Sequence, residues 1–147
     1  MDMVDCIFCA IAARQAPASV VFEDDVCLAF MDLFPMVPGH LLVVPKTHAA
    51  NLSELDEATG MHLFRIAQRM AAAVRGSGLR CEGINLFLAD GEAAGQDVFH
   101  VHLHVVPRFQ GDAVVIAATF GHPTRAELDA DAIHIASVLT SPAPELP

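Results

Sequence analysis

The sequence contains neither tryptophan nor tyrosine, and its 147 residues include only 8 lysines and arginines against 18 aspartates and glutamates. Without indole or phenol side chains the protein should absorb weakly near 280 nm, so a bound aromatic ligand would be easy to detect. The formal charge of -10 argues against binding of polynucleotides through their phosphates, which depends on basic side chains. A small anionic ligand is still compatible, because backbone amides can hold a phosphate despite an adverse net charge.

Membrane-spanning and secretory segments are also missing from the sequence. The longest apolar stretch, Ala113 to Phe120, is too short to cross a bilayer. The first residues, Met1 to Asp5, lack the basic and apolar regions of a secretory signal. We therefore expect a cytoplasmic protein without membrane partners. The 4 cysteines are too few for a disulfide framework in a chain of this length.

Hydrophobic periodicity predicts several short strands and three helices without a linker or an internal repeat. Helices are expected at Ile7 to Ala13, from a start near Ser53 to Asp56 until Gly76 and Gly78, and from a capping box at Thr124 and Glu127. The last helix should place Leu128, Ala132, Ile135 and Leu139 on one face. Strands are expected at Val20 to Glu23, Cys27 to Met31, His40 to Pro45, Ile84 to Leu88, along the histidines at 100 to 104, and near Val114 to Ala118.

Three histidines occupy alternate positions in the segment Gly95 to Arg108, GQDVFHVHLHVVPR. Successive side chains of a strand point to opposite faces, so His100, His102 and His104 should share one face and the intervening apolar residues the other. Residues two apart lie roughly 6.6 Å from each other along a strand, so the outer two imidazoles cannot both bind one ion. A three-histidine metal site on this strand is excluded, whereas a His-x-His metal pair or a catalytic role stays open.

This segment resembles the signature of the histidine-triad (HIT) superfamily, and Gly95-Gln96 and Pro107-Arg108 extend the match. Val21 to Asp25, Phe30 to Asp32 and Pro38 to His48 resemble the same family in order and spacing. The resemblance covers about residues 5–110 and implies an α+β, HIT-like fold, with an antiparallel sheet of about five strands packed with two or more helices. We expect one domain over residues 1–147, with a C-terminal strand and helix extension at 111–140.

The resemblance implies that the middle histidine, His102, attacks the α-phosphorus of a nucleotide and forms a nucleotidyl-imidazole intermediate that water resolves. A neutral imidazole, with an unperturbed pKa of about 6.5, has the free lone pair that this attack needs. His40 is expected to orient His102, and His104 to donate to a phosphate oxygen. Gln96 is expected to bond the phosphate or the leaving group.

For the nucleoside, Asp32 matches the family position that accepts hydrogen bonds from the ribose hydroxyls, although a turn or capping role is the alternative. Apolar residues match the clamp around the base, with ordinary core packing as the alternative: Ile7, Phe8, Ile11, Phe30 and Leu33. Their chemistry leaves the identity of the base open.

The cysteine pair Cys6-Ile7-Phe8-Cys9 is by itself compatible with a redox pair, two buried thiols or half of a zinc site. Many bacterial members of the HIT superfamily combine such a pair with two histidines, which correspond here to His48 and His100. Two thiolates and two imidazoles suit tetrahedral zinc, and a closed four-ligand set would be structural. Cys27 and Cys81 lie outside this pattern and are expected in the core.

Two positions depart from the family pattern. Ala89 replaces an asparagine or glutamine of relatives, and Asp97 replaces a serine or threonine that touches the scissile phosphate or leaving group. An ionised Asp97 near phosphate would repel it, so the side chain should point away or act as an acid. Pro107 to Asp112 resemble the dinucleoside-polyphosphate hydrolase branch.

We therefore predict a hydrolase of adenine-type dinucleoside polyphosphates, working as a homodimer on small nucleotides. The first alternative is an adenosine phosphoramidase or aminoacyl-adenylate hydrolase. A zinc-bearing nucleotide-binding module with little turnover is an alternative of another class. A nucleotidyl transferase is disfavoured by the single short domain.

Overall fold

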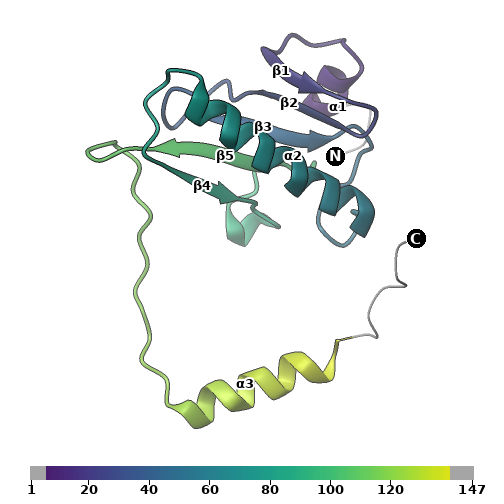
Figure 1. The fold of residues 1–147 in the computed structure, drawn as a ribbon. Coiled ribbons are helices and arrows are strands. Elements are labelled where there is room, and N and C mark those ends of the chain that lie inside the picture. The colour runs from purple at the N-terminus through teal and green to yellow at the C-terminus, as the bar shows by residue number, and fades with distance from the viewer. Residues whose placement is uncertain (1–5, 140–147) are drawn as a thin grey trace. The chain divides into compact units, whose positions relative to one another are not determined.

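The computed structural model describes residues 6–139, and the chain divides into two compact units that meet between Val114 and Val115. The first unit is built on a five-stranded sheet of strand order β1-β2-β3-β5-β4 in which every neighbouring pair is antiparallel (Figure 1). Its elements are α1 (Ile7–Ala12), β1 (Val20–Glu23), β2 (Cys27–Met31), β3 (Leu41–Pro45), α2 (Glu57–Gly76), β4 (Gly83–Phe87), the 3-10 turn η1 (Glu92–Ala94) and β5 (Leu103–Arg108). The predicted α+β fold with a five-stranded antiparallel sheet is confirmed.

Alternation along the central strands gives the sheet two different apolar faces. On one face, residues such as Ala29, Val43 and Val105 join the core beneath α2. On the other face, Phe30 and Leu42 form a second cluster with residues of α1. Both faces of β2 and β3 are therefore covered, which explains why these strands are continuously apolar in sequence.

Helix α2 lies across the first face of the sheet (Figure 1). Its buried residues recur at helical spacing: Leu63, Ile66, Ala67, Met70 and Val74. Asp56 caps the helix, since its side chain accepts a hydrogen bond from the Thr59 backbone N–H. The N-cap is therefore Asp56, the last residue of the range Ser53 to Asp56 in which the helix was predicted to start, and Ser53 lies before the helix.

The prediction for the triad strand was wrong at its beginning. Strand β5 starts at Leu103, so His100 and His102 precede it. The Val101 N–H donates to the Ala49 carbonyl, 2.8 Å away, and not to a neighbouring strand of the sheet. Only His104 of the three histidines lies within the ladder, where it pairs with Leu42 and Phe87.

The strand predicted at Val114 to Ala118 is also wrong, because this segment is irregular. Its composition favours a strand, but Val115 and Ile116 are 83% and 73% exposed and have no neighbouring strand to pair with.

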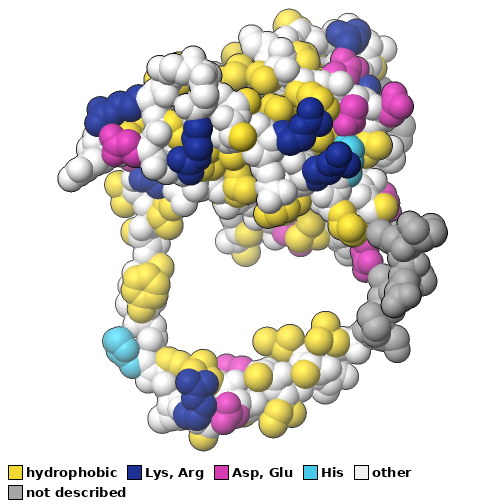
Figure 2. Space-filling model, in the orientation of Figure 1, with side chains coloured by type: hydrophobic (Ala, Val, Ile, Leu, Met, Phe, Trp, Pro, Cys, Tyr) yellow, Lys and Arg dark blue, Asp and Glu magenta, His cyan; other side chains and the backbone are white. Residues whose placement is uncertain are grey.

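The second unit contains helix α3 (Arg125–Ser137). The predicted capping box is confirmed: the Thr124 side chain accepts from the Glu127 N–H, and the Glu127 carboxylate accepts from the Thr124 N–H. The predicted stripe of Leu128, Ala132, Ile135 and Leu139 is exposed, as are other apolar side chains of this segment (Figure 2). Among residues 6–139, no helix combines the length and apolar character needed to cross a membrane.

Candidate active site and metal centre

The sheet places the histidines on the face opposite α2. His104 of β5 is the cross-strand partner of Leu42, which in turn pairs with Phe30. Paired residues project to the same face, so these side chains form a row on the α1 side. His40 immediately precedes β3 and reaches His104, with 2.9 Å between His40 Nε2 and His104 Nδ1. The buried His102 ring lies 4.9 Å from the His104 ring, measured between centroids.

His102 has one ring nitrogen fixed by the backbone. Its Nδ1 lies 2.7 Å from the His100 carbonyl oxygen, and a carbonyl can only accept, so Nδ1 carries the proton. In the neutral ring Nε2 then holds the lone pair. Nε2 lies 3.8 Å from Oδ1 of Asp97. The site thus contains a buried imidazole whose nucleophilic atom is defined by its hydrogen bond.

A second chain of hydrogen bonds defines the tautomer of His104. The Met36 backbone N–H donates to His40 Nδ1 at 3.1 Å, which leaves the proton of His40 on Nε2. His40 Nε2 therefore donates to His104 Nδ1, and His104 must carry its own proton on Nε2. The consequence is a positioned N–H donor beside His102.

The environment keeps these two rings neutral. Burial, together with the neighbouring His102 and His40 rings, lowers the pKa of His104 to about 4. Burial also lowers the pKa of His40, against the opposing effect of Asp32. A neutral His104 can still donate a hydrogen bond to a phosphate oxygen through its Nε2–H, without carrying a positive charge.

Aromatic side chains enclose the imidazoles. Phe8 of α1 meets the His102 ring edge-on at 5.2 Å and the Phe30 ring at 5.5 Å, between centroids. Phe87 of β4 stacks on His104 at 4.2 Å with an interplanar angle of 14°. The rings therefore have little freedom to rotate.

The residues expected around the nucleoside fall into two groups. Phe8 and Phe30 are buried in the second core cluster, and Ile11 packs against it. Ile7 and Leu33 are 47% and 83% exposed, so these two can contact a ligand without leaving a core. Three of the five expected clamp residues therefore belong to the core cluster or pack against it, whereas Ile7 and Leu33 remain exposed to solvent.

Asp32 has the turn role that was the alternative considered from sequence, and it also lies beside His40. Its Oδ1 accepts from the Phe34 N–H at 2.9 Å, which closes a turn. Its Oδ2 lies 3.4 Å from His40 Nε2, so the carboxylate also borders the histidine site.

Gln96 is buried, and its amide is fully engaged with the backbone. Its Oε1 accepts from the Gly91 N–H at 2.7 Å, and its Nε2 donates to the carbonyls of Ala50 and Val98. The side chain fixes the loop that precedes the triad. The contact of Gln96 with phosphate or leaving group stays a prediction, and such a contact would have to compete with these three hydrogen bonds.

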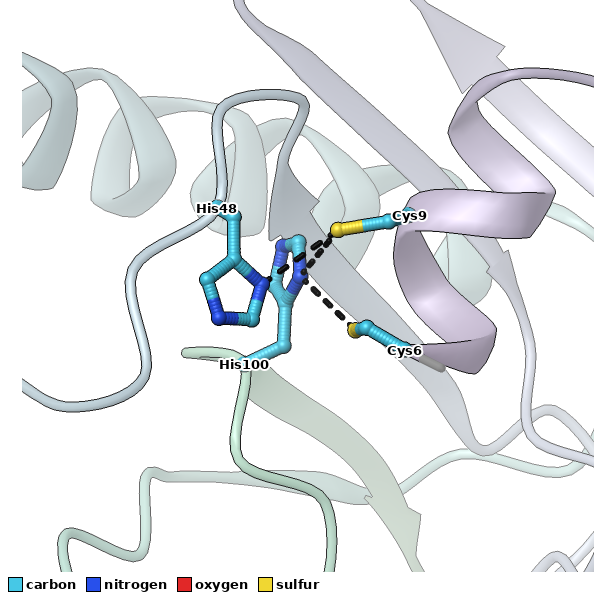
Figure 3. A group of neighbouring side chains, drawn as sticks. All are labelled: Cys6, Cys9, His48 and His100. Atoms are coloured by element: carbon cyan, nitrogen blue, oxygen red, sulfur yellow. Dashed lines mark hydrogen bonds between the residues drawn. The ribbon is translucent and has the colours of Figure 1, made fainter. Parts of the chain in front are cut away.

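Cys6, Cys9, His48 and His100 converge as the resemblance implied (Figure 3). Their ligand atoms all lie within 4.8 Å of one another. The sulfur–nitrogen separations are 3.4 Å for Cys6 and His100, 3.3 Å for Cys9 and His48, and 3.5 Å for Cys9 and His100. A tetrahedral zinc with bonds of about 2.3 Å to sulfur and about 2.0 Å to nitrogen has sulfur–nitrogen edges of roughly 3.5 Å. The residues present therefore fit zinc.

A hydrogen bond outside the ligand set supports this geometry. His100 Nε2 donates to the Pro45 carbonyl at 2.8 Å, which leaves the lone pair on Nδ1, the nitrogen that faces both cysteines. Histidine ligands of metals are commonly oriented in this way. Burial, together with the neighbouring Cys6, raises the pKa of the Cys9 thiol to about 11. A bound cation would favour the thiolate instead.

Sequence reasoning missed one partly buried contact between distant segments. His62 of α2 meets Asp24 of the β1–β2 hairpin, with 2.7 Å from Nε2 to Oδ2. Asp24 also accepts from the Val26 and Cys27 N–H groups, while burial raises the pKa of the Cys27 thiol to about 12. The contact attaches the hairpin to α2, and a lone histidine in a helical pattern gave no signal for it.

Fold and site together define a small α+β protein with a buried imidazole, whose Nε2 holds a lone pair, beside a Cys2His2 cluster. The chain belongs to the HIT family, whose HIT domain model matches residues 13–111. It is 41% identical to an uncharacterized HIT-like protein of Borreliella burgdorferi over 75% of this chain and 80% of that one. It is 34% identical to the adenylylsulfatase HINT3 of Arabidopsis thaliana over 75% of this chain and 55% of that one.

Solved structures agree in fold. A HIT family protein from Bacillus subtilis superimposes with a TM-score of 0.86 and 35% identity, over 94% of this chain and 99% of that one. A Zn-bound histidine triad family protein from Mycobacterium smegmatis gives a TM-score of 0.75 and 39% identity, over 94% and 100% of the two chains. A HIT family hydrolase from Legionella pneumophila superimposes with a TM-score of 0.63 and 38% identity, over 72% of this chain and 95% of that one.

Proposed function

We propose that the protein is a nucleotide hydrolase that cleaves at the α-phosphate through a covalent intermediate on His102. The observation that carries the proposal is the hydrogen bond from His102 Nδ1 to the His100 carbonyl, which leaves the lone pair on Nε2. A relative named an adenylylsulfatase and a neighbour described as a hydrolase support a hydrolytic reaction. They do not define the bond that this chain cleaves.

The reaction would run in two displacements. Nε2 of His102 attacks the α-phosphorus, so an N–P bond forms while the bond to the leaving group breaks, and the leaving group departs with the electron pair and takes a proton from solvent. Water then attacks phosphorus, the N–P bond breaks, and the nucleoside monophosphate is released with the water's proton passed to solvent. Two inversions retain configuration at phosphorus.

The neighbouring residues have roles that follow from their hydrogen bonds. His104 would donate from Nε2 to a non-bridging oxygen, where negative charge develops. His40 would fix the tautomer of His104 through the bond between them. Asp32, beside His40, would accept from the ribose hydroxyls, and Leu33 and Ile7 would contact the base.

Cys6, Cys9, His48 and His100 would hold zinc. Four protein ligands leave no open position, so the metal would contribute to folding and supply no chemistry to the substrate. We also propose that the protein works as a homodimer on small nucleotides, which sedimentation of the purified protein tests.

The leaving group has two candidates. The segment Pro107 to Asp112 supports a dinucleoside polyphosphate such as diadenosine tetraphosphate, as predicted from sequence. The position of Asp97 beside His102 Nε2 supports the alternative substrates, whose leaving groups carry an amine: the amine itself departs from an adenosine phosphoramidate, and an amino acid departs through its carboxylate from an aminoacyl adenylate. A substrate panel separates the two.

The first experiment is chromatography of the wild type and His102→Ala after incubation with diadenosine tetraphosphate and, separately, adenosine 5′-phosphoramidate. The wild type should release AMP from at least one of them, and His102→Ala should release none while still binding AMP by calorimetry. Equal turnover by the variant would remove the nucleophile assignment. Binding of AMP without turnover by the zinc-loaded wild type would favour the binding-module alternative.

A further inference from the structure

We propose that Asp97 selects substrates by the charge of their leaving group, disfavouring polyphosphates and favouring amines. The inference rests on the proposed function, since it concerns groups that depart after attack by His102. The residue does not point away from the site, which was one of the two expectations from sequence.

The geometry places a carboxylate at the nucleophilic atom. Asp97 Oδ1 lies 3.8 Å from Nε2 of His102. The same oxygen accepts from the Val98 N–H at 2.9 Å, so the backbone holds the side chain in this direction. The Asp97 side chain is 86% exposed while that of His102 is 3% exposed, so the carboxylate stands between the buried nucleophile and solvent, where the outer part of a substrate must lie.

The charges nearby do not neutralise this carboxylate. Lys46 Nζ pairs with Glu23 at 2.8 Å, and Arg108 pairs with Asp112 at 2.7 Å. A second carboxylate, Asp32, borders His40, and His40 and His104 are held neutral. The charged side chains that the structure places at these histidines, Asp32 and Asp97, are therefore acidic.

A negative charge at this place acts oppositely on the two kinds of leaving group. A departing polyphosphate gains negative charge on its oxygen as the P–O bond breaks, and Asp97 repels it. A departing amine leaves with the electron pair of the P–N bond and takes two protons from solvent, the first giving the neutral amine and the second the ammonium, which Asp97 attracts. The interaction differs between transition states and therefore changes relative rates.

The test compares kcat/KM for diadenosine tetraphosphate with kcat/KM for adenosine 5′-phosphoramidate in the wild type, Asp97→Asn and Glu92→Gln. The asparagine keeps an oxygen that can accept from the Val98 N–H but removes the charge. Glu92→Gln is a matched control, because it removes one charge from an exposed residue of the same loop that has no described contact with the histidines. The ratio of polyphosphate to phosphoramidate cleavage should rise about tenfold in Asp97→Asn, as expected for one unit charge near 4 Å in partly aqueous surroundings, and stay unchanged in Glu92→Gln.

Ionic strength provides a second readout that a purely structural role would not move. Salt screens an exposed charge, so the ratio should rise with salt in the wild type and stay level in Asp97→Asn. An unchanged ratio in Asp97→Asn, with the wild type active, would overturn the role of Asp97 and leave the proposed function standing. Cleavage of neither substrate by the wild type would remove both.

Discussion

Four of the five histidines of the two sites differ in which ring nitrogen is bonded, and this difference separates their proposed roles. His100 turns Nε2 to the Pro45 carbonyl and Nδ1 to the cysteines. His102, two residues later, turns Nδ1 to a carbonyl. His40 and His104 share a bond with each other. Under the proposed function, one residue type therefore supplies a metal ligand, a nucleophile, an orienting group and a donor.

The lowered pKa values of His40 and His104 predict that the protein loses stability on acidification. An unfolded histidine has a pKa of about 6.5, whereas folded His104 has a pKa of about 4. Below about pH 6.5 the unfolded chain binds more protons, so the free energy of unfolding falls as pH falls towards 4, by up to ~1.4 kcal/mol per pH unit for each such histidine. Above that range the contribution is fully present. Urea unfolding at several pH values, with zinc in excess and again after chelation, measures this slope.

The control for this prediction is a pair of variants. His104→Gln removes a titrating group and should reduce the slope, whereas His122→Gln removes an exposed histidine of the second unit and should not. A slope that is the same in all three proteins would contradict the assignment to His104.

At the scale of elements, α1 is the part of the site that cannot stand alone. It has 6 residues and no side-chain cap, and helices this short are unstable in isolation. Helix α1 is attached to the sheet in two ways: Phe8 packs against the second core cluster, and Cys6 and Cys9 contribute to the candidate metal centre. We therefore expect the position of Phe8 beside His102 to depend in part on the metal centre.

Loss of zinc should therefore cost stability more than nucleotide affinity. His48→Ala should reduce the bound zinc from about one ion per chain to almost none and lower the free energy of unfolding by several kcal/mol, because metal binding is linked to folding. His122→Ala is the control, since this exposed histidine lies in the second unit, outside the metal cluster. Elemental analysis, urea unfolding and AMP calorimetry provide the three readouts. Wild-type protein purified without chelators that contains no zinc would contradict the metal assignment.

Element boundaries show where sequence reasoning succeeded and where it did not. The capping box of α3 and the extent of α2 follow from local patterns, and both were predicted correctly. The beginning of the triad strand was not, because three alternate histidines continue the strand pattern while Val101 is bonded to Ala49, a partner that no local pattern reveals. Val114 to Ala118 has strand composition without a neighbouring strand. The metal cluster was found only because the family resemblance joined residues that are far apart in the chain.

At the scale of the whole molecule, every candidate site residue lies in the first unit, as do both core clusters. We therefore expect a protein that ends after Val114 to keep the fold, the zinc and the nucleotide chemistry. Val114 is retained because its carbonyl accepts from Arg108.

Melting temperature, zinc content and AMP release of the truncated and full chains test this expectation. Equal zinc content and turnover within about twofold would agree with it, since unperturbed surface regions contribute little to either. A truncated protein that folds and binds zinc but no longer turns over would show that the second unit contributes to catalysis.

The two contributions of His100 come from different parts of the residue. Its side chain serves the metal, whereas its main-chain carbonyl orients the nucleophile, and a carbonyl is present whatever the amino acid. The metal centre can therefore change over evolutionary time, to another ligand set or to none, without an accompanying change in the group that orients His102. Position 100 separates metal dependence from catalytic competence, so the two properties are free to diverge among descendants of this chain.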